Sequence, residues 1–370
     1  MKIRQVLLLV LWTALWVSCA VDTPKRNVIP FYVGTYSPDS SKGIFVSELD
    51  TVTGHLATPR LAASVNNAGY LNFTADGQYL LVASKSIGNA PDLFVYRRDI
   101  SDNSLTLVDS LAVQGTVACY VSEVGHSWVA LALYSSGDVV FVPVTKEGTL
   151  VKNKMIRYVH EGSGPDTLRQ EHAHVHSVIS DMAGKYAYVA DLGADMVKVY
   201  EVTADTVVPV TKIFTTPGSG PRHMVIHPSG EYLAVLNELS STIDFFGKDS
   251  LNIYSKWQKT VALLPDSIAR NSTAADIHFS DDGKYLYASV RGANRLYMLS
   301  AGAENAEVIG FVEEEINWPR NFSLDPTGHF VLVANRYGNS VIVYKRDSST
   351  GELALTSGKI VMDQPVCVLF

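Results

Sequence analysis

Short runs of alternating hydrophobic and polar residues recur along most of the chain, and turn residues separate them. Each copy consists of a strand, a tight turn that ends in glycine, and a second strand of alternating aromatic and aliphatic residues. This two-residue period predicts β-strands, and glycine suits the positive φ of a hairpin turn. The clearest copies span residues 70–85, 176–192, 223–239, 276–292 and 321–338, with turn glycines at Gly77, Gly184, Gly230, Gly283 and Gly328.

The spacing of these glycines predicts the architecture. From Gly184 to Gly328 they lie roughly 45 to 53 residues apart, a period typical of β-propeller blades. Residues 120–137 form a weaker sixth copy. The C-terminal "PVCVLF" (365–370) begins a further repeat that stops after one strand, and the N-terminal "FYVGTY" and "GIFVSELD" supply its missing strands. We therefore predict an all-β, seven-bladed β-propeller over residues 31–370, closed by pairing of the N- and C-terminal strands; a pair of β-sandwiches is the alternative.

The first residues have a different pattern. "MKIRQVLLLVLWTALWVSCA" has a basic start and an apolar run too short to be a typical membrane span, as in a secretory signal peptide. Val17-Ser18-Cys19 resembles a bacterial lipobox, and Ser18-Cys19-Ala20 alternatively fits small-x-small cleavage. We expect a signal peptide over 1–19, a tether over 20–30, and a protein that is periplasmic or attached to a bacterial membrane through a lipid on Cys19.

Composition limits the classes of partner. The 370 residues are 47% hydrophobic and 18% charged, with a net charge of −7, so nothing favours a nucleic-acid partner. Cys119 and Cys367 lie in apolar stretches and are expected in the core rather than in a disulfide framework.

The repeat register places ionisable residues at one end of the hairpins. Eight residues before the turn glycine lie His176, Arg222 and Arg320, and eight residues after it lie Lys85, Glu238, Arg291 and Arg336. In an antiparallel hairpin both positions lie away from the turn, so these side chains should gather at one mouth of the central channel. We predict a pocket for an anionic ligand beside a base, to which His174, His223 and Asp276 also contribute; a solvated rim of salt bridges between blades is the alternative.

The stretch "RQEHAHVHSV" (169–178) contains three alternating histidines, His172, His174 and His176. A strand would place them on one face, where they could bind zinc. However, His172 and His174 precede the strand, and no pattern of cysteines or carboxylates completes a dedicated cage. We therefore expect neither a metal site nor a cofactor.

Five motifs resemble the lactonase family of seven-bladed propellers, which includes 6-phosphogluconolactonases and carboxy-muconate cyclases. They are "RQEHAHVHSV", "DLGADMVKVY", "PGSGPRHMVIHPSGEYLAVLNELSSTI", "LLPDSIARNSTAADIHFSDDGKYLYASVRG" and "PRNFSLDPTGHFVLVAN". The resemblance implies that His176, Arg222, Glu238 and Arg291 are catalytic. The extra histidine, His172, is a departure from the family pattern.

The implied chemistry is hydrolysis of a lactone. His176 or Glu238 would deprotonate water, and Arg222 and Arg291 would stabilise the oxyanion or bind a substrate anion. We expect an exported enzyme that hydrolyses a small anionic sugar lactone or lactone acid. A non-catalytic propeller that binds a ligand or a protein, and a lactone-forming cyclase, are the alternatives.

Overall fold

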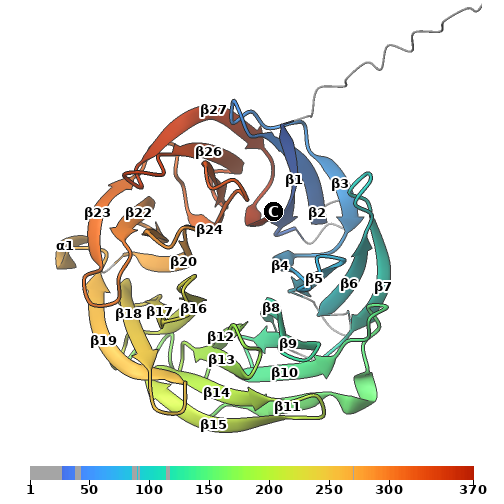
Figure 1. The fold of residues 1–370 in the computed structure, drawn as a ribbon, viewed down its shortest axis with the longest axis vertical. Helices are drawn as coiled ribbons and strands as arrows, with labels where there is room; N and C mark the ends of the chain where they lie inside the picture. The colour runs from blue at the N-terminus through green and yellow to red at the C-terminus, as the bar shows by residue number, and fades with distance from the viewer. Residues whose placement is uncertain (1–26, 38–42, 86–89, 91, 114–116, 270) are drawn as a thin grey trace, which may run out of the picture.

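Seven four-stranded antiparallel sheets form a ring in the computed structural model, which describes residues 27–37, 43–85, 90, 92–113, 117–269 and 271–370 (Figure 1). The seven-bladed propeller predicted from the glycine period is thus confirmed, and the pair of β-sandwiches is excluded. The expected signal peptide (1–19), with Cys19, and most of the tether lie outside the described residues. The first blade strand, β1, begins at Val28, inside the last residues assigned to the tether.

Each blade runs from an inner strand near the axis to an outermost strand at the rim. The inner strands are β4 (Ala68–Phe73), β8 (Ala118–Val124), β12 (Val175–Ser180), β16 (Pro221–Ile226), β20 (Thr273–Phe279), β24 (Pro319–Leu324) and β28 (Pro365–Leu369). The second strands are β5 (Tyr79–Ser84), β9 (Trp128–Leu133), β13 (Tyr186–Asp191), β17 (Tyr232–Asn237), β21 (Tyr285–Arg291), β25 (Phe330–Asn335) and β1 (Val28–Thr35).

The outer half of each blade holds the remaining strands. The third strands are β6 (Leu93–Arg98), β10 (Asp138–Pro143), β14 (Met196–Val202), β18 (Thr242–Lys248), β22 (Arg295–Ser300), β26 (Ser340–Arg346) and β2 (Gly43–Asp50). The outermost are β7 (Leu105–Leu111), β11 (Ile156–Val159), β15 (Val207–Phe214), β19 (Tyr254–Ala262), β23 (Glu307–Val312), β27 (Leu353–Val361) and β3 (Arg60–Ser64). Among the described residues, two short helices, η1 (Lys152–Lys154) and α1 (Asp266–Ala269), lie in connections between strands. In the described part of the chain, no helix is long and apolar enough to cross a membrane.

The ring is closed by both ends of the chain. β28 is the inner strand of the sheet whose other strands are β1, β2 and β3, and it pairs antiparallel with β1, with Gly34 opposite Cys367. In Figure 1 the C-terminus accordingly lies next to β1. The predicted closure is confirmed, and it gives the inner edge of β1 a hydrogen-bonding partner.

The hydrophobic core lies between neighbouring blades. The second strands are almost entirely buried, because both faces of a blade pack against its neighbours. The outermost strands are largely exposed, as β15 illustrates. The five turn glycines all have φ between 67° and 71°, as the hairpin turns require. The weaker copy differs, because His126 and Ser127 rather than Gly125 have positive φ there.

Every inner strand has a β-bulge near its beginning. In each sheet the register against the second strand shifts by one residue at this point. The extra residues, which we call the bulge residues, are Gly69, Cys119, His176, Arg222, Ala275, Arg320 and Val366. A bulge redirects the side chain of the extra residue. The three ionisable residues predicted from the position before the turn glycine are all bulge residues.

Candidate active site

A cavity of about 560 Å³, which we call the mouth cavity, lies at the end of the inner strands away from the hairpin turns. Its volume is in the usual range for a small-molecule site. Seven ionisable residues were predicted at this mouth from their distance of eight positions to a turn glycine. The structure brings six of them together in the cavity, and the seventh, Arg222, lies directly behind Glu238. The lining residues are Tyr36, Asn67, Lys85, Val117, Cys119, Tyr134, Arg169, His176, Glu238, Arg291, Arg320, Arg336 and Gln364.

Glu238 is surrounded by three guanidinium groups. Its Oε1 accepts a hydrogen bond from Arg169 Nη2 at 2.6 Å, and its Oε2 accepts one from Arg222 Nε at 2.8 Å. Arg291 Nη2 lies 3.1 Å from the same Oε2. The residue is only 3% exposed. Both carboxylate oxygens are therefore occupied by cationic donors.

This arrangement keeps the carboxylate charged. Burial alone would raise the pKa of Glu238, but Arg291, Arg222 and the other positive neighbours hold that pKa well below its ordinary value. Burial lowers the pKa of Arg291 to about 10, which still leaves it protonated at neutral pH. Glu238 is thus a weak base whose main effect is to hold the arginines in place.

Two carbonyl groups of strand β20 also position two of the arginines, Arg222 from the neighbouring blade and Arg291 from the same blade. Arg222 donates Nη1 to the carbonyl oxygen of Ala275, and Arg291 donates Nη2 to that of Ala274 at 3.0 Å. Arg222 is 1% exposed and does not line the cavity. We therefore assign it to positioning Glu238, whereas Arg291 reaches the cavity itself.

His176 faces the cavity as a neutral imidazole. Burial, followed by the charge of Arg222, lowers its pKa well below the ordinary value. Its ring lies edge-on to Tyr134, with centroids 5.6 Å apart. Among the described residues, Nδ1 has no hydrogen-bond partner and is shielded from solvent. A neutral histidine at this position can accept a proton.

The opposite side of the cavity holds cations and, among its described lining residues, no carboxylate. Arg320 donates Nη2 to the Tyr36 hydroxyl at 2.9 Å, and Arg336 donates Nε to Gln364 Oε1 at 3.2 Å. The guanidinium groups of both lie about 5 Å from the centre of the Tyr36 ring. Within the part of the chain that the structure describes, neither these two arginines nor Lys85 forms an ion pair.

Arg169, Tyr36 and Tyr134 are among the residues of this cavity that the sequence patterns did not predict. Arg169 lies in the connection between β11 and β12, outside the repeats, so no alignment of hairpins could place it. Tyr36 and Tyr134 follow a second strand and donate their N–H to a carbonyl of the connection before the inner strand, as Lys85, Glu238 and Arg336 do. Tyr36 and Tyr134 therefore occupy the same position in their blades as Lys85, Glu238 and Arg336, although their distance from a turn glycine did not reveal it.

The structure corrects the predicted places of His223 and Asp276. Each directly follows a bulge residue, and neither lines the mouth cavity. They line a second cavity of about 260 Å³ that includes residues near the hairpin turns, such as Ser180 and Ile226. The reason is that successive side chains of a strand point in different directions, so neighbours in sequence separate at this point.

The residues after the bulge residues form a layer, which we call the plug layer. They are Tyr70, Tyr120, Ser177, His223, Asp276, Asn321 and Cys367. Asp276 accepts hydrogen bonds from His223 Nδ1 at 2.6 Å and from Asn321 Nδ2 at 2.5 Å. The rings of Tyr70 and Tyr120 stack with centroids 4.0 Å apart. Cys119 and Cys367 are both buried and free, as expected from the sequence.

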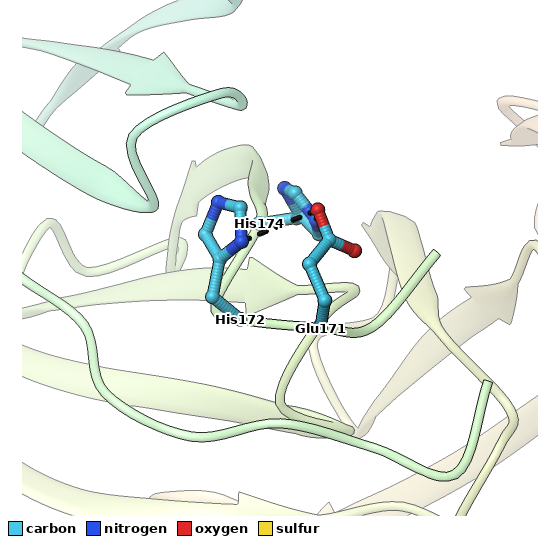
Figure 2. Close-up of side chains that lie close together, drawn as sticks. All are labelled: Glu171, His172 and His174. Atoms are coloured by element: carbon cyan, nitrogen blue, oxygen red, sulfur yellow. Dashed lines mark ion pairs between the residues drawn. The ribbon is translucent and has the colours of Figure 1, made fainter. Parts of the chain in front are cut away.

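His174 is also displaced from its predicted place. Its ring stacks on Tyr134 with centroids 4.5 Å apart, but His174 itself does not line the cavity. The structure also revises the view that no carboxylate joins the histidines. Glu171 lies next to His172 and His174, as Figure 2 shows.

Comparisons with known proteins agree with this architecture. The sequence model of the family described as "Lactonase, 7-bladed beta-propeller" matches residues 30–370. A 6-phosphogluconolactonase of Bacillus subtilis is 31% identical over 92% of this chain and 97% of its own length. Another 6-phosphogluconolactonase, from Formosa agariphila, is 28% identical over 90% of this chain and 96% of its own.

A solved structure adds a third relative. The periplasmic gluconolactonase of Pseudomonas aeruginosa superposes with a TM-score of 0.84 at 28% identity, covering 92% of this chain and 98% of the other. The family model and the Bacillus subtilis relative both extend over nearly the whole propeller. The two curated relatives above are named 6-phosphogluconolactonases, which are lactone hydrolases, and the chain therefore belongs to the lactonase family of seven-bladed β-propellers.

Proposed function

We propose that this protein is an exported lactonase that hydrolyses a sugar-derived lactone carrying an anionic group. The observation that carries the proposal is the charge of the mouth cavity. Among the described residues, six cations, namely Lys85 and five arginines, lie in or directly behind it with the single carboxylate of Glu238. The chain as a whole is acidic, with a net charge of −7, so this concentration of positive charge is local.

The two sides of the cavity fit two parts of such a substrate. The side with Glu238, His176 and Arg291 combines a neutral proton acceptor with a fixed guanidinium group. The side with Lys85, Arg320 and Arg336 offers cations without an ion-pair partner among the described residues, and guanidinium groups bind phosphates and carboxylates well. The lactone ring would lie over the first side and the anionic group over the second.

The chemistry requires one proton acceptor and one oxyanion donor. His176 takes a proton from water while the oxygen attacks the lactone carbonyl carbon, and the negative charge that develops on the carbonyl oxygen faces Arg291. The ring C–O bond then breaks, and the leaving alkoxide receives the proton from His176. His176 suits this role better than Glu238, because arginine donors occupy both oxygens of that carboxylate.

Export rests on the N-terminal sequence and on one relative. Residues 1–19 have the pattern of a signal peptide that ends at a lipobox-like cysteine, and the Pseudomonas aeruginosa relative is described as periplasmic. In a bacterial host, the full chain should incorporate a radiolabelled fatty acid, and Cys19→Ser should abolish that label. A mature wild-type protein that carries no lipid would overturn the tether but not the enzymatic proposal.

The enzymatic proposal is tested with a panel of sugar lactones, with and without phosphate or carboxylate groups. Acid release is followed with a pH indicator in weak buffer, and spontaneous hydrolysis is subtracted. We expect turnover of at least one anionic lactone, and we expect Arg291→Ala to lower kcat/KM on the order of 10²-fold. The matched control is Arg295→Ala, since Arg295 pairs with Glu313 outside the cavity.

Two results would overturn the proposal. One is the absence of turnover above background across the panel, together with tight binding of the anionic lactones, which would indicate a binding protein. The other is an Arg291→Ala variant that is as active as Arg295→Ala, which would place the chemistry elsewhere.

A further inference from the structure

A cluster of three potential metal ligands lies beside the mouth cavity and is not needed for lactone hydrolysis. The ligand atoms of Glu171, His172 and His174 lie within 4.8 Å of one another (Figure 2). His172 Nδ1 and His174 Nε2 are each 3.3 Å from the same oxygen, Glu171 Oε1. Two imidazoles and one carboxylate are a ligand set found in zinc sites.

The hydrogen bonds of the two rings determine which nitrogens are free. His172 Nε2 lies 3.1 Å from the carbonyl oxygen of Ser135, and His174 Nδ1 lies 2.9 Å from that of Tyr134. Because a carbonyl oxygen only accepts hydrogen bonds, each of these nitrogens carries the proton. In the neutral rings, the other nitrogen of each has its lone pair available. Metal-binding histidines are commonly oriented in this way, by donating their second N–H to a carbonyl.

The free nitrogens face an atom that has no proton to offer. When both rings are neutral, the two nitrogens that lie next to Glu171 Oε1 carry lone pairs, and these three acceptors repel one another unless a positive charge lies between them. With zinc–ligand bonds of about 2.0–2.2 Å, tetrahedral geometry separates two ligand atoms by about 3.3 Å. The nitrogen-to-oxygen distances of 3.3 Å match this separation.

We propose that Glu171, His172 and His174 bind one divalent transition-metal ion of the zinc type. The side chains of Glu171 and His172 are each 48% exposed, so the remaining coordination position is open to water. The site is separate from the mouth cavity, because His174 stacks on Tyr134, which lines that cavity, but none of the three ligand residues lines it. The metal would fix the segment 169–174, whose first residue, Arg169, donates a hydrogen bond to Glu238.

The test uses zinc chloride and the full chain purified without a histidine tag, after dialysis against a chelator. Isothermal titration calorimetry should show one zinc ion per chain. His172→Ala and Glu171→Gln should each weaken binding by at least tenfold, whereas His55→Ala, an exposed histidine in the connection between β2 and β3, should bind as the wild type does. Both site variants alter exposed side chains, and matched thermal unfolding curves would show that they fold.

A second readout tests the structural role. Bound zinc should slow amide hydrogen exchange in segment 169–174 of the wild type and leave it unchanged in His172→Ala. Three results would overturn the proposal: no saturable binding at one ion per chain, equal affinity in His172→Ala and His55→Ala, or binding that leaves exchange in this segment unchanged. In the first case the cluster is only a pair of ionic contacts between Glu171 and protonated histidines. None of these readouts depends on lactone hydrolysis.

Discussion

Two buried carboxylates in the central channel belong to adjacent layers but have opposite surroundings. Glu238, at the mouth cavity, is held by the permanent cations Arg169, Arg222 and Arg291. Asp276, in the plug layer, is held by His223, His278 and Asn321. Glu238 lines the mouth cavity, and its single negative charge does not neutralise the three arginines around it. Asp276 instead accepts hydrogen bonds from donors of the two neighbouring blades.

The buried charge of Asp276 links blades, whereas that of Glu238 holds arginines at the mouth cavity. The hydrogen bonds of Asp276 join strand β20 to β16 and β24, and they involve no excess of fixed positive charge. Around Glu238 the positive charges outnumber the carboxylate, so an anion entering the cavity gains attraction that the protein itself does not neutralise. Substitutions in the two layers should therefore have different consequences.

The largest expected effect is on activity at the mouth. Glu238→Gln keeps the size of the side chain but removes the charge that orders Arg291 and Arg222, so kcat/KM should fall on the order of 10²–10³-fold. Initial rates of acid release, normalised to the folded fraction by circular dichroism, measure this. A folded variant with wild-type kcat/KM would show that the carboxylate has no part in the reaction.

The equivalent change in the plug layer should act on stability instead. Asp276→Asn keeps one acceptor oxygen and replaces the other by an NH2 donor, so either His223 or the pair of His278 and Asn321 then faces a donor instead of an acceptor. The free energy of unfolding should fall by about 3 kcal/mol, while kcat per folded molecule stays within about threefold of wild type. Urea unfolding and the same rate assay provide both numbers; a stable but inactive variant would contradict the structural role.

Acid should weaken the plug layer through His223. Burial, followed by the charge of Arg222, lowers the pKa of His223 to about 4, below its ordinary 6.5. Between pH 6.5 and 4 the unfolded chain therefore binds a proton that the folded chain does not, so stability falls as pH falls, by about 3 kcal/mol. Urea unfolding across this range should show a shallower decline for His223→Gln, and an unchanged slope would contradict the assignment.

The smallest effect is expected on the side of the mouth cavity with Lys85, Arg320 and Arg336. Arg336→Ala removes one partner of the substrate anion without touching the reacting atoms, so KM should rise about tenfold and kcat should change little. Steady-state kinetics on an anionic lactone measure both constants, with Arg295→Ala as the control. A decrease in kcat at unchanged KM would instead place Arg336 at the reacting centre.

The residues at the mouth and the closure of the ring were largely predictable from the repeated hairpin pattern of the sequence. The turn glycines give the register, and the register gives the bulge residues His176, Arg222 and Arg320, because in each of the five blades with a turn glycine the bulge residue lies eight positions before that glycine. Closure by β28 was predictable in the same way, since the C-terminal strand begins a repeat that it does not complete.

The remainder depends on features that a repeat alignment does not contain. His223 and Asp276 were placed at the mouth because they are adjacent in sequence to bulge residues, but the side chains of adjacent strand residues diverge. Tyr134 was missed because the turn of its blade has positive φ at His126 and Ser127 and not at Gly125. Counting eight residues from Gly125 therefore ends at Leu133, one residue before Tyr134. Arg169 lies in the connection between β11 and β12, outside the aligned hairpins, so only the folded structure brings it to Glu238.

The central claim is that Lys85, Arg320 and Arg336, which have no ion-pair partner among the described residues, select an anionic lactone. The most direct test is the ratio of kcat/KM for two gluconolactones that differ only in a phosphate group, measured for the wild type and for the double variant Arg320→Ala, Arg336→Ala. We predict a ratio of at least about tenfold in favour of the phosphorylated lactone in the wild type, falling close to one in the double variant. A wild type that hydrolyses the neutral lactone as well as the phosphorylated one, or a ratio that survives loss of both arginines, would contradict this claim.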